Sequence, residues 1–343
     1  MRLEDLDYTL PPHYIAQQPC EPRDAARLLV YQRSTGEIQH SRVAHLADFL
    51  QPGDVLVAND TRVIHARLFG RREATGGKVE LLLLRPRQED AWEALVRPSQ
   101  RLRPGVRVLL DSSDSNVPDV VEIGEVLPHG KRLVHFLVDP AAVLERSGTV
   151  PLPPYIRKPL EDPDRYQTTY ARVSGSAAAP TAGLHFTPRL VQDLEAYGVR
   201  FGFITLHIGL DTFQPIREAD PLQHPIHSEY LEVPAATVQL IQETKARQGR
   251  VIAVGTTSAR ALESAADAQG VMQPFSGETR LYIYPGYTFR VVDGILTNFH
   301  LPRSTLLLLV AAYTGLDELK RIYRAAIEEN YRFYSFGDAS LLL

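Results

Sequence analysis

Residues 69–150 differ in hydrophobic pattern from the rest of this 343-residue chain. They contain short β-type runs separated by glycine, proline and Asp-Ser clusters, with little of the roughly 3.6-residue period of an amphipathic helix. Several short strands at such spacing predict a small antiparallel barrel or sandwich. The expected strands lie at 79–84, 92–96, 106–110, 120–126 and 133–138.

The segments on either side alternate between strand and helix signals. Thr187 followed by Pro188 is typical of a helix start, and Gly198 of a left-handed helix end. Strands that alternate with helices of this length favour a largely parallel sheet covered by helices. Further helices are expected at 234–248, 258–269, 305–313 and 316–330, and strands at 28–32, 37–43, 55–58, 199–208, 250–254, 281–284, 289–292 and 295–297.

Together these patterns predict the α/β class, as a discontinuous α/β domain with an inserted antiparallel β domain, either a barrel or a sandwich. The α/β domain is expected to comprise residues 1–68 and 151–343, and the inserted β domain residues 69–150. Two domains also suit the chain length, because single hydrophobic cores stop growing at about 250–300 residues.

The composition favours a soluble, cytoplasmic protein. Hydrophobic residues make up 44% of the chain and charged residues 23%, as in ordinary globular proteins. The longest strongly apolar run, 306–312, is far shorter than the roughly 20 residues that a membrane-spanning helix needs. The N-terminus carries acids where a signal peptide has basic residues. A single cysteine, Cys20, excludes internal disulfides and thiolate-cluster metal sites.

The charge distribution is uneven. The chain as a whole has a net charge of −4, which does not indicate a nucleic-acid-binding protein. Residues 62–107, however, hold eleven basic and five acidic residues. A local arginine excess can contact a phosphate backbone, or it can form the solvated face of a sheet. Both interpretations stay open from the charge alone.

Polar residues follow two of the expected buried strands, where open α/β sheets bind ligands. Gly255 leads into Thr256, Thr257 and Ser258 at a helix start, which can hold a carboxylate or phosphate. The structural alternative is that Ser258 is only an N-cap. The lysine of a P-loop and the three glycines of a dinucleotide fold are both missing. Asp60 and Arg62, after the strand at 55–58, can orient an amine or pair with phosphate, or can simply close a turn.

Five of the eleven histidines lie beside loop-like polar residues: His185, His207, His224, His227 and His300. A lone histidine at a strand end is more often a hydrogen-bonded core residue than a catalytic one. Five in such settings raise the odds that at least one transfers a proton. A metal site at 224–229 is disfavoured by the spacing and by the proline between the two histidines. The aromatic segment 331–339 around Asp338 can stack a flat base or pack the last strand.

Eleven short motifs follow one another along the chain, among them Gly255-Thr256-Thr257-Ser258. The others lie at 57–64, 77–80, 151–156, 165–171, 179–187, 205–209, 227–229, 284–287, 297–306 and 331–333. With this set the chain resembles the S-adenosylmethionine:tRNA ribosyltransferase-isomerases of queuosine biosynthesis. The resemblance covers essentially the whole chain, and the ordered set makes it specific although each motif alone is weak.

The resemblance implies an α/β domain with an inserted barrel, in agreement with the pattern above. It implies transfer and isomerisation of the ribosyl moiety of S-adenosylmethionine onto 7-aminomethyl-7-deazaguanine at the tRNA wobble position. The products are epoxyqueuosine in tRNA, adenine and methionine. It implies no metal or other cofactor, with S-adenosylmethionine as co-substrate, and a monomer. The chain departs from the family pattern at Asp211, where many relatives have glycine, and at Ala259 and Ala261, where valine and threonine are common.

This chemistry assigns expected roles to the candidate residues. A base must take the proton of the attacking amine, another proton must leave the carbon beside the sulfonium, and adenine leaves more easily when protonated. His185 and His207 are the leading candidates for proton transfer, followed by Glu229, Asp60 and Asp338. The expected substrate-binding residues are Thr256, Thr257 and Ser258 for the methionine carboxylate or ribose, Asn298 and His300 for adenine or the sugar, His227, Arg62 for the anticodon stem-loop, and Tyr166, Tyr170 and Phe186 for stacking.

Two other functions compete with this one. A non-catalytic tRNA-binding module explains the local positive charge but not the histidine and Thr-Thr-Ser clusters. A methyltransferase that uses the same donor needs a glycine-rich strand–turn–helix loop, and none occurs near the N-terminus.

Overall fold

The computed structural model describes residues 1–112, 119–209, 215–226 and 228–343. The chain forms two compact units. The first contains residues 1–62, 153–173 and 179–343, and the second contains residues 63–152 and 174–178. No helix in the described ranges is long and apolar enough to cross a membrane.

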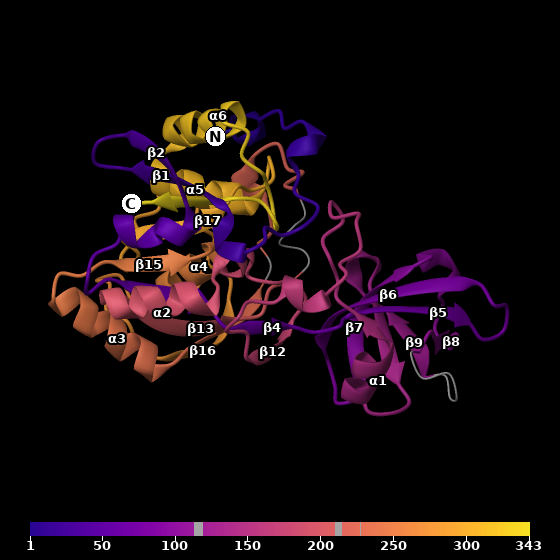
Figure 1. Ribbon diagram of the computed structural model, residues 1–343. Helices are drawn as coiled ribbons and strands as arrows, with labels where there is room; N and C mark the ends of the chain where they lie inside the picture. The colour runs from indigo at the N-terminus through magenta and orange to yellow at the C-terminus, as the bar shows by residue number, and fades with distance from the viewer. Residues whose placement is uncertain (113–118, 210–214, 227) are drawn as a thin grey trace. The chain divides into compact units, whose positions relative to one another are not determined.

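The first unit is built on a nine-stranded mixed sheet (Figure 1). Its strands, in spatial order, are β16 (Phe275–Thr279), β14 (Glu229–Val233), β13 (Arg200–Leu206), β3 (Val55–Asn59), β15 (Val251–Val254), β17 (Gly294–Asn298), β18 (Ala339–Leu342), β1 (Arg27–Gln32) and β2 (Glu37–Arg42). The four central strands β13, β3, β15 and β17 are parallel. Their carboxyl ends therefore meet at one edge of the sheet, which is where open α/β sheets bind ligands.

Helices cover both faces of this sheet. They are α2 (Pro188–Tyr197), α3 (Ala235–Ala246), α4 (Thr256–Ser264), α5 (Thr305–Thr314) and α6 (Leu316–Glu328). The capping signals of α2 are confirmed, because Thr187 Oγ1 accepts from Leu190 N–H and Gly198 has a φ of +104°. Leu190 and Leu194 of α2 enter a core with Leu56 and Ile252. On the opposite face α3 lies so close to β13 that a Cβ on Gly202 would come within 3.2 Å of Leu240.

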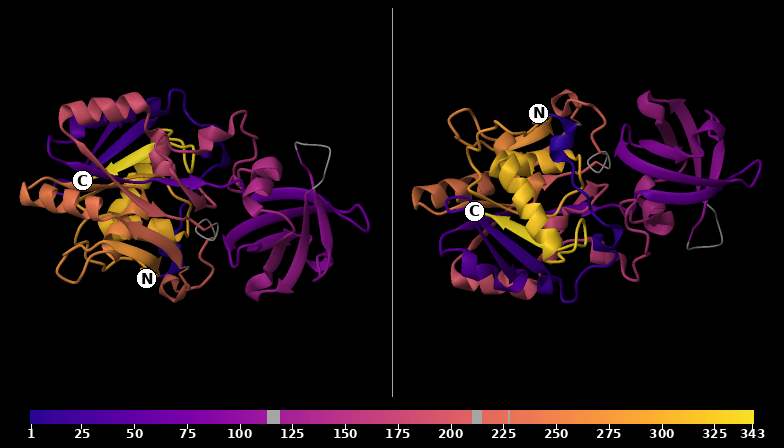
Figure 2. Two further views of the ribbon diagram at one scale, coloured as in Figure 1. Left: turned by 90° about the horizontal axis from the view of Figure 1, so that it is seen from below. Right: turned by 90° about the horizontal axis from the view of Figure 1, so that it is seen from above.

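The second unit is a closed barrel of six antiparallel strands, with one helix at its end (Figure 2). Its core is formed by the inward-facing residues of all six strands, such as Leu68, Leu81 and Val121. The strands in ring order are β5 (Arg67–Arg72), β6 (Lys78–Pro86), β7 (Ala91–Arg97), β10 (Arg132–Phe136), β9 (Val120–Val126) and β8 (Arg107–Leu110), which returns to β5; β11 (Gly148–Thr149) adds to β5, and α1 spans Pro140–Ser147. Two further short strands, β4 (Thr61–Val63) and β12 (Val173–Ser176), pair with each other. The expected fold class is thus confirmed, although the large sheet is mixed rather than largely parallel.

Residues 281–284 and 289–292 are not strands, contrary to the sequence prediction, and the strand of this region is β16. The reason is a buried carboxylate. Glu263 of α4 is 2% exposed and accepts the backbone N–H groups of Arg290, Val291 and Val292 at 3.0–3.2 Å. These donors are satisfied by a side chain, so the segment needs no partner strand.

Other elements also differ from expectation. Helix α4 ends at Ser264 rather than at 269, because the Asp267 side chain accepts from the N–H groups of Gln269 and Val271 and turns the chain. Strand β5 was missed, since the sequence interpretation treated 62–69 as a crossing between domains. Helix α1 was also missed, as it has only eight residues and gives little periodic signal.

Candidate active site

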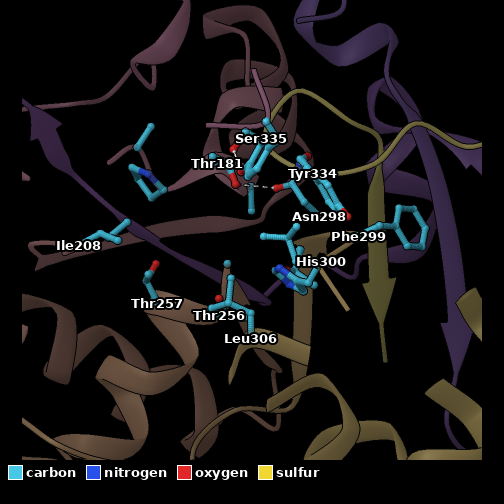
Figure 3. Close-up of a pocket in the computed structure, with 17 residues that line it drawn as sticks. Thr181, Ile208, Thr256, Thr257, Asn298, Phe299, His300, Leu306, Tyr334 and Ser335 are labelled. Atoms are coloured by element: carbon cyan, nitrogen blue, oxygen red, sulfur yellow. Dashed lines mark hydrogen bonds between the residues drawn. The ribbon is translucent and has the colours of Figure 1, made fainter. Parts of the chain in front are cut away.

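A cavity lies at the edge of the large sheet where the parallel strands end, and its space of about 540 Å³ is partly open to solvent. The first residues of α4 form one wall, and the residues that follow β17 form another (Figure 3). Thr256 and Thr257 face Thr181 and Ser335 across the space. The structure therefore brings the Thr256-Thr257 turn, Asn298 and His300 together in one cavity, as the sequence predicted for residues that follow neighbouring parallel strands.

Asn298 joins three segments of the cavity wall. Its side chain accepts a hydrogen bond from Thr181 Oγ1 at 3.1 Å and donates from Nδ2 to the carbonyl of Tyr334 at 3.1 Å. The same Nδ2 lies 3.4 Å from His185 Nε2. Because both ends of the amide are engaged, its orientation is fixed. Tyr334 is itself held at a φ of +71°, a conformation that is uncommon outside glycine and that clusters at functional sites.

His300 is held from both sides of its backbone. Its N–H donates to Tyr323 Oη at 2.9 Å, and its carbonyl accepts from the Tyr8 hydroxyl. Its Nε2 shares a 2.9 Å hydrogen bond with Thr297 Oγ1. Burial lowers the pKa of His300 to about 3. The imidazole is therefore neutral at physiological pH, which suits orientation of a ligand better than proton donation.

The turn into α4 presents hydroxyls and backbone donors to the cavity. Gly255 makes the turn with a φ of +92°, which L-residues with a side chain rarely adopt. Thr257 Oγ1 is occluded and has no hydrogen-bond partner among the described residues. The first N–H groups of a helix have no intrahelical partner either, so this corner can bind a carboxylate or a ribose hydroxyl. The Ser258 hydroxyl instead donates to Val254 O at the end of β15, at 2.8 Å, and Ser258 is fully buried and absent from the cavity lining.

A second cavity, with a space of about 580 Å³ that is also partly open to solvent, adjoins the first. The two share Thr256, Thr257 and Leu306 in their walls. Arg260 and Glu229 form a buried ion pair in the second cavity. Glu229 Oε1 also accepts from Gly209 N–H at 3.2 Å, and Arg260 also donates to the carbonyls of Thr279 and Leu281. This fixed pair places one positive and one negative group, both already hydrogen-bonded, beside an apolar wall.

His207 follows β13 beside the end of β3. Asn59 joins the two strands, because its side chain donates to the carbonyl of Leu206 and accepts from its N–H. His207 Nδ1 shares a 2.8 Å hydrogen bond with Thr61 Oγ1, and the ring stacks on Tyr230 with centroids 5.5 Å apart. Burial lowers the pKa of His207, while the nearby carboxylate of Asp60 opposes that shift. The half-buried ring is thus neutral and able to accept a proton.

Asp60 and Asp338 are buried carboxylates with several partners. Asp60 is 2% exposed, accepts from Thr205 Oγ1 at 2.7 Å and pairs with Arg172 at 2.7 Å. Asp338 accepts from the N–H groups of Arg27 and Arg332 at 3.0 and 2.7 Å. The Asp338 carboxylate thus joins two backbone segments, whereas the Asp60 carboxylate joins two side chains. Their predicted catalytic roles, like those of the other candidates, stay predictions.

His185 lies behind Asn298 and is 5% exposed. It lines a separate small hollow with Ser335 and Gly337 rather than the main cavity. Burial lowers its pKa to about 4, although the charge of Asp338 acts in the opposite direction. His185 is therefore adjacent to the candidate site through the Asn298 amide.

The remaining predicted residues lie outside the cavity or outside the described ranges. Arg62 is half exposed and pairs with Asp164 at 3.6 Å. Tyr166 and Phe186 have fully buried rings, whereas Tyr170 is half-buried and packs against Phe186. His227 and Asp211 lie outside the described residues. Within the described ranges, no group of three or more His, Cys, Asp or Glu side chains is placed to hold a metal ion.

Sequence reasoning missed four residues of the two cavities. Tyr155 donates to or accepts from Ser335 Oγ at 2.7 Å, and its ring lies 4.9 Å from that of Tyr334. Tyr155 and Tyr334 belong to the segments 151–156 and 331–339, whose sequence pattern does not single out either residue. Thr181 likewise lies inside the motif at 179–187. Arg260 follows the Thr256-Thr257-Ser258 cluster by one helical turn, a spacing that places it on the same helix side.

The two buried histidines predict acid destabilisation. In the folded state the pKa is about 4 for His185 and about 3 for His300, below the usual 6.5. At a pH between the folded-state and unfolded-state pKa values, the unfolded chain binds more protons than the folded chain. The free energy of unfolding therefore falls as the pH is lowered from 6.5. We expect a slope of about 1 kcal/mol per pH unit from each histidine. Urea unfolding between pH 7.5 and 5 measures it, and His300→Gln should reduce the slope; an unchanged slope contradicts the assignment.

Comparison with known proteins connects this geometry to a family. The model of the family described as "Queuosine biosynthesis protein" matches residues 3–342. The chain is 50% identical over 346 residues to the S-adenosylmethionine:tRNA ribosyltransferase-isomerase of Moorella thermoacetica, and 50% identical over 348 residues to that of Symbiobacterium thermophilum, each covering 100% of both chains.

A solved structure extends the likeness to the fold. The crystal structure of an S-adenosylmethionine tRNA ribosyltransferase from Thermotoga maritima is 37% identical and aligns with a TM-score of 0.57. The alignment covers 99% of this chain and 100% of that one. The resemblance expected from the ordered motifs is confirmed, and the chain belongs to the queuosine biosynthesis protein family.

Proposed function

We propose that this enzyme transfers and isomerises the ribosyl moiety of S-adenosylmethionine onto 7-aminomethyl-7-deazaguanine at the tRNA wobble position. The products are epoxyqueuosine in tRNA, adenine and methionine. The curated relatives named above support this activity over their whole length. The observation that carries it in this chain is the pair of adjoining cavities that share Thr256 and Thr257 at the edge of the sheet where the parallel strands end.

The donor has two chemically different halves, and the two cavities differ in the same way. The cavity with Asn298, His300 and the rings of Tyr155 and Tyr334 offers flat faces and amide groups to adenosine. The cavity with Arg260 and Glu229 offers paired charges and an apolar wall to the methionine half. In this pose the sulfonium and the ribose lie between the cavities, beside Thr256 and Thr257.

The reaction requires proton transfers near the sulfonium and the ribose, where the two halves of the donor meet. The attacking amine must be neutral, and a base must remove a proton from the carbon next to the sulfonium. We assign proton transfer to the neutral imidazoles of His207 and His185, with Glu229, Asp60 and Asp338 as further candidates. His207 is the more accessible of the two imidazoles, since its ring is half-buried.

The remaining assignments complete the proposal. Arg62 and arginines of the barrel contact the phosphates of the anticodon arm, and Tyr166, Tyr170 or Phe186 and His227 contact the substrates. The enzyme works as a cytoplasmic monomer, and the sulfonium of the co-substrate supplies the driving force without a further cofactor.

One assay separates this function from its alternatives. The full chain is incubated with S-adenosylmethionine labelled in the adenine ring and with tRNA that carries 7-aminomethyl-7-deazaguanine. We expect free adenine and a modified nucleoside in equal amounts. Release of S-adenosylhomocysteine indicates methylation instead, and binding of tRNA without consumption of the donor indicates a non-catalytic module.

A further inference from the structure

The outer face of the barrel strands β5, β6 and β7 carries a motif that the proposed chemistry does not use. Val79 lies in the barrel core, so its neighbours Lys78 and Glu80 point outward. The strand register places Glu80 between Phe69 of β5 and Arg97 of β7, and places Lys78 opposite Arg71. We call these residues, together with Arg67, the Phe69 face.

The Phe69 face combines an exposed aromatic ring with positive charge. Phe69 is 42% exposed, although it is a large apolar side chain. The Arg97 side chain is 86% exposed, and Arg71 and Lys78 are also exposed. Glu80 lies within 3.3 Å of Arg67 and 4.0 Å of Arg97, so one acid stands among four cations. Arg71 and Lys78 form no ion pair with any residue that the structure describes.

Several other cations of the barrel have acidic partners. Glu93 pairs with Arg85 and Arg87 and also lies near Lys131, while Asp119 pairs with Arg146. Of the eleven basic residues counted at 62–107, four lie on the Phe69 face: Arg67, Arg71, Lys78 and Arg97. Half-buried Leu82 and Leu95 lie opposite each other on the same face.

We propose that the Phe69 face binds the anticodon arm of the substrate tRNA, an inference that rests on the proposed function. Arg71, Lys78 and Arg97 contact backbone phosphates, and Phe69 stacks on an unpaired base of the loop. Unpaired bases stacked on exposed aromatic rings, with cations along the backbone, are the usual mode of single-strand RNA recognition. Glu80 holds Arg67 and Arg97 apart and so fixes the spacing of the cations.

The experiment compares full-length variants with the parent enzyme. In Arg71→Gln/Lys78→Gln/Arg97→Gln, we expect the Kd for an anticodon stem-loop RNA and the KM for tRNA to rise about 10- to 100-fold, with the KM for S-adenosylmethionine unchanged. The slope of log Kd against log salt should fall by about one for each phosphate-binding cation that is removed. Phe69→Leu should weaken RNA binding about 5- to 50-fold and leave the salt slope unchanged.

Arg247→Gln is the matched control, because Arg247 is an exposed arginine at the end of α3, at the opposite edge of the sheet from the cavities. It should bind RNA like the parent, and thermal unfolding should show all variants folded. Parent-like RNA binding by the triple variant overturns the proposal, as does an equal rise in the KM of both substrates. If the parent binds RNA without consuming the donor, the proposed function fails, whereas weaker binding by the triple variant still supports the Phe69 face.

Discussion

Replacing His207 with alanine is expected to lower kcat by about 10²- to 10⁴-fold, the usual contribution of a general base, while tRNA binding persists. His207 Nδ1 is engaged by Thr61 Oγ1, and that hydroxyl also lies 3.4 Å from the carbonyl of Val173. When the Thr61 hydroxyl donates to the Val173 carbonyl, its oxygen accepts the hydrogen on His207 Nδ1. The lone pair of the imidazole is then on Nε2. Because burial lowers the pKa of His207, the acid limb of the rate profile should lie below pH 6.5.

Two further variants sharpen this prediction. Thr61→Val removes the partner of Nδ1 and should lower kcat about tenfold without changing tRNA binding. His40→Ala is the matched control, since His40 Nδ1 also has a hydroxyl partner, Tyr331 Oη at 2.8 Å, and an aromatic neighbour 5.6 Å away, but lies on the edge strand β2. Single-turnover kinetics measures the effect. Parent-like activity of both His207→Ala and His185→Ala refutes proton transfer by these histidines.

Replacing Arg260 with leucine is expected to destabilise the fold by about 3–5 kcal/mol, because Glu229 stays buried without its counter-charge. The double variant Glu229→Gln/Arg260→Leu should recover much of that stability, since glutamine can still accept from Gly209 N–H. Both variants should also raise the inhibition constant of methionine roughly 10- to 100-fold, as expected when a charged hydrogen-bonding group is removed. The inhibition constant of adenine should not change.

Arg250 is the matched control for Arg260. It directly precedes β15, whereas Arg260 lies in α4, which follows that strand. Arg250 pairs with Asp54, which is 1% exposed, at 2.6 Å. Arg250→Leu should therefore cost comparable stability in urea unfolding but leave inhibition by methionine at the parent value. If Arg260→Leu and Arg250→Leu affect methionine inhibition equally, the second cavity does not hold the methionine half.

The sequence could predict the fold class because its signals are local. The caps at Thr187 and Gly198 are set by neighbouring residues, and a change of hydrophobic period marks the barrel without any tertiary information. The segment 289–292 could not be predicted in the same way, because the N–H groups of residues 290–292 are satisfied by Glu263 of α4, which lies 27 to 29 positions earlier. Tertiary contacts, rather than propensity, decided that segment.

The candidate site was predictable to a similar extent. Thr256, Asn298 and His300 each follow a parallel strand, so the rule for open sheets places them together. The second cavity was not predictable, because Glu229 and Arg260 are 31 positions apart and meet only when β14 packs beside α4. Glu229 was predicted as a candidate base, but its partner was not. The family expected from the motifs is confirmed by the family match.

The position of β18 has a consequence for how the enzyme is made. This strand inserts between β17 and β1, so Arg27 and Asp338, 311 positions apart, are joined by a hydrogen bond. During synthesis β1 and β2 leave the ribosome early and remain a lone hairpin until β18 has been made. Such a hairpin is at best marginally stable in water. Assembly of the sheet, and with it the cavity wall at Tyr334 and Ser335, is therefore a late event in translation, and nascent chains lacking β18 expose two strand edges to chaperones.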